Sequence, residues 1–384
     1  MSDAEVIVIG GGIAGASAAW RLAPVARVVV LEREDRCGHH STGRSAASFT
    51  ENYGTSIIRR LAIGSRDFLT GPPEGFAEHP LLGPRGMITI AREDQADLIA
   101  FELDRARRFV PSVTEIPVDE AVTRVPVLRR DYVARAIIEP DSKDIDVNGL
   151  HEGFLRGVRR AGGRIVTGAE VLSIARHGAD WEVETPMGRF RAPRLVNAAG
   201  AWGDVIARLA GVRPQGLMPM RRTAFNIACP QGMDCRTWPL LNDVGGEFYF
   251  KVTGGQIMVS PGDATPSSPM DAWPEEMDIA IGADRLERAT TLQVRRVLKA
   301  WAGLRTFAPD GSPVVGEAPD AAGFFWLVGQ GGYGIKTSPA LSRIVAAQVL
   351  DRPFPGELAA LGLSSGDFAP GRAARAANMP LEMT

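Results

Sequence analysis

The segment VIVIGGGIAGASAAWRLAPVARVVVLERE, residues 6–34, constrains the fold more than any other part of the chain. Short apolar runs at 6–9 and 28–31 are typical of buried parallel strands. The small residues of 13–22 favour a helix that packs closely on those strands. Two parallel strands joined by a helix make a βαβ unit, so the sequence predicts an α/β fold built on a parallel sheet.

A glycine-rich turn with the pattern Gly10-x-Gly12-x-x-Gly15 joins the first strand to the helix. Gly10 permits the turn, Gly12 lets the backbone approach a pyrophosphate, and Gly15 lets the helix pack on the strand. The start of the helix offers free N–H groups and the positive end of its dipole to phosphates. Glu32 ends the second strand, where its carboxylate can accept hydrogen bonds from ribose hydroxyls. These residues predict a dinucleotide site.

Strand-rich stretches interrupt the nucleotide-type elements along the chain. Residues 217–260 contain the strand-like runs RRTAFNIA, EFYFKV and GQIMVS. This order predicts an α/β (α+β) fold in which a Rossmann-like nucleotide-binding domain is interleaved with a mixed-sheet substrate-binding domain. The first domain is assigned to residues 1–85, 140–215 and 305–365, the second to 86–139 and 216–304, and a loosely ordered tail to 366–384. Helices are expected at 56–70, 93–108, 146–163, 275–300 and 338–351.

Composition narrows the function and the compartment. A formal net charge of −2 argues against a general nucleic-acid binder. The odd count and wide spacing of Cys37, Cys229 and Cys235 predict no disulfide framework and a reducing compartment. The N-terminus MSDAEVIVIG has acids where a signal peptide needs basic residues. We therefore expect a cytoplasmic protein, a monomer or weak dimer, with no transmembrane segment.

Motifs over nearly the whole chain resemble one family. The glycine turn, STGRSAA (41–47), LVNAAGAWGD (195–204) and GQGGYGIKTSPA (329–340) resemble FAD-dependent amine oxidoreductases, and more closely the D-amino-acid oxidase and dehydrogenase group. VPVLRRD, EFYFK and WAGLR look most like the bacterial D-arginine dehydrogenase type. Three glycine turns that approach a nucleotide also favour FAD over NAD. Because WAGLRTF has no cysteine, the resemblance implies non-covalent FAD.

The resemblance implies a cofactor site that extends well beyond the first turn. A short helix beginning near Arg44 or Ser45 is expected to present its N–H groups to the cofactor. Besides Gly10, Gly12, Gly15 and Glu32, the implied cofactor residues are Ile13, Ala14, Arg33, Ser41, Thr42, Ser45, Ala46, Ala47, Val171, Ala199, Gly200, Gly331, Gly332, Tyr333, Gly334 and Ile335.

The segment RCGHHSTGRSAASFTENYGT, residues 36–55, also has metal and thiol interpretations. Adjacent His39 and His40 are expected to point apart, with no acid or further histidine at ligand spacing beside them. A nucleophilic Cys37 has no purpose if a flavin does the redox chemistry. We therefore predict no metal site and no thiol catalysis.

The resemblance implies that Arg222, Tyr249 and Arg305 hold the substrate α-carboxylate. The planar fork of arginine matches a carboxylate and stays charged at any working pH. The Gly332 carbonyl is implied to orient the amine, and Tyr53 to lie in a mobile lid of the substrate wall. The flavin would accept a hydride from Cα at N5, and the imino acid would hydrolyse to a 2-oxo acid and ammonia.

Substrate selectivity is expected to depend on Ser48, Thr50, Glu51 and Met87. D-Arginine dehydrogenases have a glutamate where this chain has Gly86 and Met87. Losing that carboxylate removes the partner of a cationic side chain, so we predict a preference for neutral or apolar D-amino acids. Glu51 could replace it only if its loop folds inward.

Alternatives within the same fold are oxidation of secondary amines (sarcosine, glycine, proline) and of 2-hydroxy acids. A non-enzymatic flavoprotein subunit is a further alternative. Single residues do not separate an oxidase from a dehydrogenase. The resemblance implies a D-amino-acid dehydrogenase with a quinone or other electron acceptor, and an oxidase that uses oxygen is the alternative.

Overall fold

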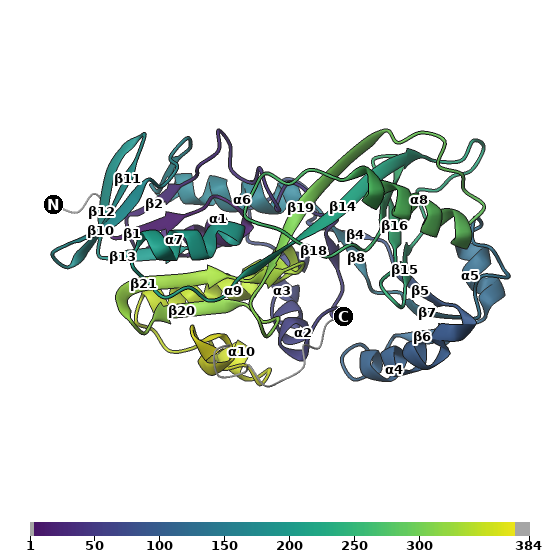
Figure 1. The fold of residues 1–384 in the computed structure, drawn as a ribbon. Coiled ribbons are helices and arrows are strands. Elements are labelled where there is room, and N and C mark those ends of the chain that lie inside the picture. The colour runs from purple at the N-terminus through teal and green to yellow at the C-terminus, as the bar shows by residue number, and fades with distance from the viewer. Residues whose placement is uncertain (1–3, 373–384) are drawn as a thin grey trace.

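The computed structural model describes residues 4–372, which build two halves, each around a large sheet (Figure 1). The first half has a six-stranded sheet of order β20-β21-β13-β1-β2-β9. Its strands are β1 (Val6–Ile9), β2 (Val28–Leu31), β9 (Arg164–Val166), β13 (Arg194–Asn197), β20 (Val314–Ala318) and β21 (Ala321–Val328). The predicted α/β class is confirmed.

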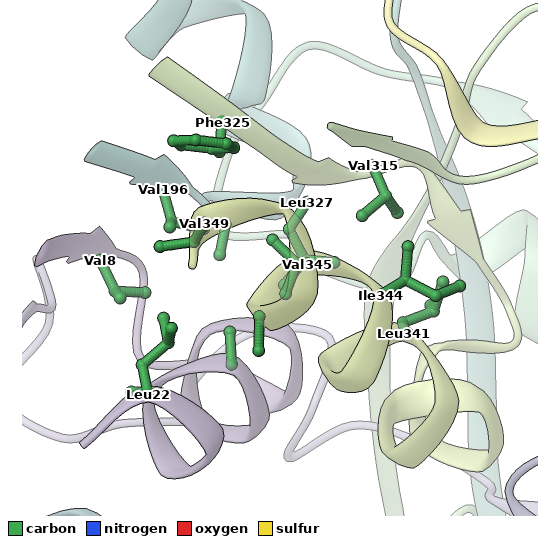
Figure 2. Packing of buried hydrophobic residues seen from close by; sticks show 14 of the residues in the cluster. Val8, Leu22, Val196, Val315, Phe325, Leu327, Leu341, Ile344, Val345 and Val349 are labelled. Atoms are coloured by element: carbon green, nitrogen blue, oxygen red, sulfur yellow. The ribbon is translucent and has the colours of Figure 1, made fainter. Parts of the chain in front are cut away.

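The first strand lies inside the sheet because every one of its side chains is buried. Val8 pairs with Val30 on β2 and with Val196 on β13, both in parallel register. Helices α1 (Ile13–Leu22) and α9 (Gly334–Val349) cover one face. Figure 2 shows Leu22 of α1 and Val345 of α9 among the apolar side chains of the sheet. The opposite face packs on α7 and on a small sheet of β10, β11 and β12.

The second half holds a ten-stranded sheet of order β22-β19-β14-β17-β16-β15-β5-β7-β6, with β18 paired to β14. Its longest members, β14 and β19, run antiparallel between the two halves in Figure 1. The strands are β5 (Met87–Ala91), β6 (Thr114–Ile116), β7 (Arg135–Glu139), β14 (Met218–Ala228), β15 (Leu240–Asp243), β16 (Tyr249–Thr253), β17 (Gln256–Ser260), β18 (Thr265–Pro266), β19 (Lys299–Phe307) and β22 (Gln330–Gly331).

Two of these strands do not follow the predicted domain bounds. β19 crosses the boundary at residue 305, and β22 joins this sheet although 305–365 was assigned to the nucleotide domain. The division into domains otherwise stays a prediction. The remaining strands are β3 (Ser48–Phe49), β4 (Leu82–Pro84), β8 (Lys143–Ile145), β10 (Ser173–His177), β11 (Asp180–Thr185) and β12 (Gly188–Ala192).

Most predicted helices occur, with shifted ends. The other helices are α2 (Ser56–Ile63), α3 (Arg66–Thr70), α4 (Ala96–Arg107), α5 (Val118–Arg124), α6 (Val147–Arg160), α7 (Gly203–Leu209), α8 (Glu276–Ala289) and α10 (Gly356–Ala359), with 3-10 turns η1 (Glu93–Gln95), η2 (Gly200–Trp202) and η3 (Ser365–Phe368). The helix predicted to reach residue 300 ends at Ala289, because Thr290 is extended and its hydroxyl donates to the Leu286 carbonyl at 2.7 Å. Helix α9 begins at Gly334, before the predicted residue 338. It contains Pro339, and the Ser338 hydroxyl donates at 3.0 Å to the Ile335 carbonyl that the proline leaves without an N–H.

Two further expectations change. The segment 366–372 is packed: Phe368 is buried, and Arg372 Nε lies 2.8 Å from Asp310 Oδ2. The rest of the predicted tail, 373–384, lies outside the described residues. Cys229 and Cys235 form a disulfide, because the turn between them brings their Cα atoms to 6.6 Å. Among residues 4–372, no helix is long and apolar enough to cross a membrane. The cytoplasmic location stays a prediction.

Candidate active site

The glycine turn directs backbone donors at oxygen atoms. Gly11 N donates to Glu32 Oε2 at 2.8 Å, and Ile13 N donates to Thr42 Oγ1 at 3.0 Å. These N–H groups lie at the start of α1, where the helix leaves its first donors without internal partners. Both groups are engaged by the side chains of Glu32 and Thr42, which hold the turn in place. The glycine spacing and the helix that begins directly after β1 are the features that fit a dinucleotide.

The three predicted glycine turns meet at one edge of the six-stranded sheet. A Cβ on Gly10, whose φ is +103°, would lie 2.6 Å from the carbonyl oxygen of Ala198, just after β13. A Cβ on Gly15 would lie 1.9 Å from the Gly10 oxygen. A Cβ on Gly334, where α9 begins, would be 3.7 Å from Ile13 Cγ2. Side chains larger than hydrogen are therefore excluded from Gly10 and Gly15, as the sequence predicted.

The segment after β2 is built differently from the prediction. Residues 44–47 form no helix; Ser45 Oγ accepts from Ala47 N at 3.2 Å, and strand β3 follows. Ser41 Oγ donates to the Leu304 carbonyl at 2.6 Å, so this segment lies beside β19. The other cofactor candidates are Gly12 and Ala14 at the start of α1, Arg33 and Ala46 in loops, Val171 in the loop before β10, Ala199 and Gly200 after β13, Gly331 in β22, and Tyr333 and Ile335 at the start of α9.

His39 and His40 do not point apart. Their ring centres are 4.9 Å from each other, and both rings face Asp271, with His39 Nε2 at 3.3 Å from Oδ2 and His40 Nδ1 at 3.8 Å from Oδ1. Sequence reasoning missed Asp271 because it lies more than 200 positions away. The Arg44 guanidinium also pairs with the Asp271 carboxylate and donates to His39. This arginine supplies the positive charge that the cluster needs, so we interpret the cluster as an ion-pair network.

The Cys37 side chain packs against the glycine turn at Gly11. A Cβ on Gly11 would be 2.4 Å from its Sγ. Burial, with a smaller contribution from Glu32, raises the pKa of the Cys37 thiol to about 12. A thiol that stays protonated at working pH is a poor nucleophile.

The substrate candidates Arg222, Tyr249 and Arg305, called the clamp below, share one face of the ten-stranded sheet. On β14 and β19, Arg222 pairs with Gly303, two residues before Arg305, so the two arginines are diagonal neighbours. Arg305 Nη2 donates to the Tyr249 hydroxyl at 3.4 Å. Arg222 Nε donates to the Asp263 carbonyl. The structure therefore brings the three predicted residues together.

The clamp concentrates positive charge on half-buried side chains. Burial, and then the neighbouring Arg305, lower the pKa of Arg222. Burial raises the pKa of Tyr249, but Arg305 and Arg222 outweigh that effect and bring it below its usual value. The nearest acid, Asp263 Oδ1, is 3.9 Å from Arg222 Nε, and its oxygens already accept from Thr223 N at 2.8 and 3.0 Å. Two close guanidinium groups with one distant, engaged carboxylate favour binding of an anion.

Aromatic side chains and a glycine enclose Arg305. A Cβ on Gly332 would lie 3.1 Å from Arg305 Cζ, so the guanidinium rests on this backbone. Tyr53 and Tyr333 also lie beside Arg305. Their ring centres are 5.1 Å apart, and the ring planes meet at 62° in an edge-to-face arrangement. The predicted residues Tyr53 and Gly332 are therefore adjacent to the clamp.

The selectivity candidates are distributed around the same face. Met87 is partly buried on β5. Thr89, two residues further along this strand, is in register with Asn242, and Asn242 is in register with Tyr249. Met87 therefore lies on the same sheet face as Tyr249. Thr50 is buried, and its carbonyl faces helix α9. Ser48 Oγ is buried with no hydrogen-bond partner in the described part of the chain. Glu51 does not replace the missing acid, because Arg66 binds both of its carboxylate oxygens.

Two buried ionisable residues near Thr50 and Met87 were not predicted from the sequence. Glu139 ends β7 directly opposite Met87 and is 3% exposed. Lys336 is the third residue of α9 and is also 3% exposed. Lys336 had a signal in the sequence, because it lies among small and apolar residues in GYGIKTSPA. Glu139 had none, since an acid at a strand end is ordinarily solvated.

Comparison with known proteins agrees with this geometry. Residues 5–348 match the family model described as FAD dependent oxidoreductase. Dimethylglycine dehydrogenase of Mus musculus is 24% identical over 92% of this chain, and the chain spans 43% of that protein's length. Glycine oxidase from Geobacillus kaustophilus superposes with a TM-score of 0.83 at 22% identity, covering 97% of this chain and 99% of that one. L-Proline dehydrogenase from P.horikoshii gives 0.82 at 20% identity, covering 98% and 99%.

These relatives do not support the closer resemblance to D-arginine dehydrogenase. They do support FAD as the cofactor and an amino-acid or amine oxidoreductase as the type of enzyme. The family match covers both sheets and the converging glycine turns. The chain belongs to the family of FAD-dependent oxidoreductases.

Proposed function

We propose that this protein oxidises the C–N bond of a small amino acid, and that secondary amino acids such as sarcosine and proline are its best substrates. The observation that carries the proposal is the clamp, in which two half-buried guanidinium groups and a tyrosine hydroxyl lie within one sheet face. The names of the similar proteins, glycine oxidase, L-proline dehydrogenase and dimethylglycine dehydrogenase, all describe carboxylates with a nearby amine.

The residues of this chain would bind and orient the substrate. Arg222 and Arg305 would hold the carboxylate, with the Tyr249 hydroxyl as a third donor. The Gly332 carbonyl would accept a hydrogen bond from the amine next to Arg305. Non-covalently bound FAD supplies the hydride acceptor for the carbon beside the amine. The imine product then reacts with water. An open-chain substrate such as sarcosine, oxidised at Cα, gives an oxo acid and an amine, whereas the cyclic imine of proline opens to a single amino-oxo acid. Water is the nucleophile in both cases, so the protein need not provide one.

D-Amino acids remain the second candidate, because the clamp would accept their carboxylates equally well. The side chain would then face Met87. The acid opposite Met87, Glu139, already interacts with the buried amine of Lys336. Glu51 is engaged with Arg66, which strengthens the expectation that neutral or apolar D-amino acids are better substrates than D-arginine. Oxidation of 2-hydroxy acids would need no amine acceptor at Gly332 and is a weaker candidate.

The test is anaerobic bleaching of the flavin absorbance by a panel of substrates. Sarcosine, N,N-dimethylglycine, glycine and both enantiomers of proline are compared with D-methionine, D-phenylalanine, D-arginine and lactate. We expect a secondary amino acid to bleach the flavin fastest. A faster D-amino acid would establish the second candidate, and bleaching by no amino acid would refute both. Reoxidation of the bleached enzyme by oxygen or by a quinone then identifies the acceptor.

The pH profile gives an independent check. The amine must be neutral for its lone pair to support the developing imine, so kcat/KM should rise through one amine-type ionisation. A flat profile between about pH 6 and about pH 10 would contradict hydride transfer from a free amine.

A further inference from the structure

Residues 50–54, called the wall segment below, hold their conformation without a backbone ladder. Among residues 4–372, no backbone–backbone hydrogen bond involves this segment. Three of its carbonyls accept from buried side-chain cations instead. Lys336 Nζ donates to the Thr50 and Tyr53 oxygens at 2.8 Å each. Arg59 Nε donates to the Gly54 oxygen at 2.9 Å. The position of the wall segment therefore depends on side chains from α9 and α2.

The amine of Lys336 also lies close to two aromatic rings, Tyr53 in the wall segment and Tyr333 directly before α9. Its Nζ is 5.4 Å from the ring centre of Tyr53 and 5.6 Å from that of Tyr333. These distances are within the range of a cation–π interaction. Because both rings lie beside Arg305, one buried amine connects α9 to the wall segment and to the clamp.

Glu139 contributes from the ten-stranded sheet. It is the acid whose charge most favours protonation of Lys336. Thr50 and Asn52 lie beside its carboxylate, and Oε2 has no hydrogen-bond partner among the described residues. Burial raises the pKa of Glu139 to about 7 and lowers that of Lys336 to about 7. A buried acid and a buried amine from the two halves of the fold thus interact behind the same short segment.

We propose that Lys336 is a positioning residue that holds the wall segment, and with it Tyr53, against Arg305 of the clamp. Lys336 does not contact the substrate: both carbonyl bonds lie behind the wall, and Tyr53 and Tyr333 separate the amine from Arg305. The wall segment is then a fixed wall, where the sequence suggested a mobile lid. The expected changes in kcat and KM rest on the proposed function. The expected change in hydrogen–deuterium exchange at residues 50–54 does not.

The test compares Lys336→Met and Lys336→Gln with Lys299→Met. Methionine keeps the length of the side chain and removes its donors, glutamine keeps two N–H donors, and Lys299 is exposed at the start of β19. Hydrogen–deuterium exchange is followed at residues 50–54, and kcat and KM are measured with the best substrate of the bleaching panel. Exchange reports on the wall segment even if the substrate class is wrong.

For Lys336→Met we expect faster exchange at residues 50–54 by about tenfold or more. Loss of the two bonds to its carbonyls frees the segment, which exposes its amides and breaks the bond from Asn52 N to Thr50 Oγ1. In the same variant KM should rise by about tenfold, with kcat changed by less than about threefold. Lys336→Gln should show smaller changes in exchange and in KM. Lys299→Met should change neither exchange nor KM. Unchanged exchange in Lys336→Met would overturn the proposal, and a large loss of kcat with unchanged exchange would make Lys336 a catalytic residue instead.

If Lys336→Met does not fold, Glu139→Gln provides the second test. It preserves the shape of the carboxylate and removes only the charge that faces Lys336. We expect exchange at residues 50–54 to rise by about threefold, with little change in the exchange of α9 itself. Unchanged exchange in this variant would refute the proposal.

Discussion

Replacing Arg222 with methionine should separate substrate binding from stability. The guanidinium is half-buried beside Arg305. It donates to the Asp263 carbonyl, and the Asp263 carboxylate, already engaged by Thr223 N, lies 3.9 Å away. In the ligand-free protein, the two arginines repel each other and both are poorly solvated. Arg222→Met therefore removes a repulsion that a bound carboxylate would otherwise relieve, and we expect opposite effects on binding and on stability.

The size of the loss follows from the bonds involved. A hydrogen bond to a charged group contributes about 1.5–3 kcal/mol. Losing one such bond to the carboxylate predicts a fall in kcat/KM of about 10- to 150-fold, and a bidentate pair predicts more. Most of this fall should appear as a higher KM. The midpoint of thermal unfolding of the ligand-free variant should be no lower than that of the wild type.

Arg221→Met is the matched control. Arg221 precedes Arg222 on β14, points to the opposite face, and pairs with Glu275 and Asp278 on the side of α8. Its loss should leave KM unchanged and destabilise the fold by about 1–3 kcal/mol, because the largely buried carboxylate of Asp278 loses its partner. Steady-state kinetics and differential scanning calorimetry measure both quantities. Equal kinetic losses in the two variants, or a large loss of stability in Arg222→Met with normal KM, would refute the assignment of the clamp.

Three further predictions concern the cofactor, a buried acid and the cysteines. Gly15→Ala should lower the flavin bound per chain at least about tenfold, because its Cβ would lie 1.9 Å from a backbone oxygen. Its circular dichroism spectrum should stay that of the folded protein. The control Gly356→Ala, where a Cβ has open space, should bind flavin normally. Burial raises the pKa of Glu139 from 4.5 to about 7, so the folded state binds more protons between these values and stability should fall by roughly 3 kcal/mol as pH rises through them. Glu139→Gln should lose this dependence in urea titrations, and an identical pH profile would contradict the burial of the acid. Thiol titration of the denatured, unreduced chain should find one free thiol; three would show that Cys229 and Cys235 are not paired.

The local elements of the nucleotide half could be predicted because their causes are local. Strand β1, helix α1 and strand β2 have the predicted bounds, since apolar runs and glycine spacing act within a few residues. Errors arose where a tertiary partner decides the outcome. The end of α8 depends on Thr290 turning into an extended segment, and the cluster at His39 depends on Asp271, far away in sequence.

The clamp residues could be predicted from the sequence, whereas the buried acid behind the wall segment could not. Arg222 and Arg305 were predicted from family motifs, and the antiparallel register of β14 and β19 then brings them together. No motif marked Glu139, because its burial follows from the pairing of β7 with β5 and from the segment that covers it. A buried acid and a buried lysine are each costly alone, and each reduces the cost of the other. Such a pair can be recognised only once both halves of the fold are in place, and the segment that covers it is the one that approaches the substrate clamp.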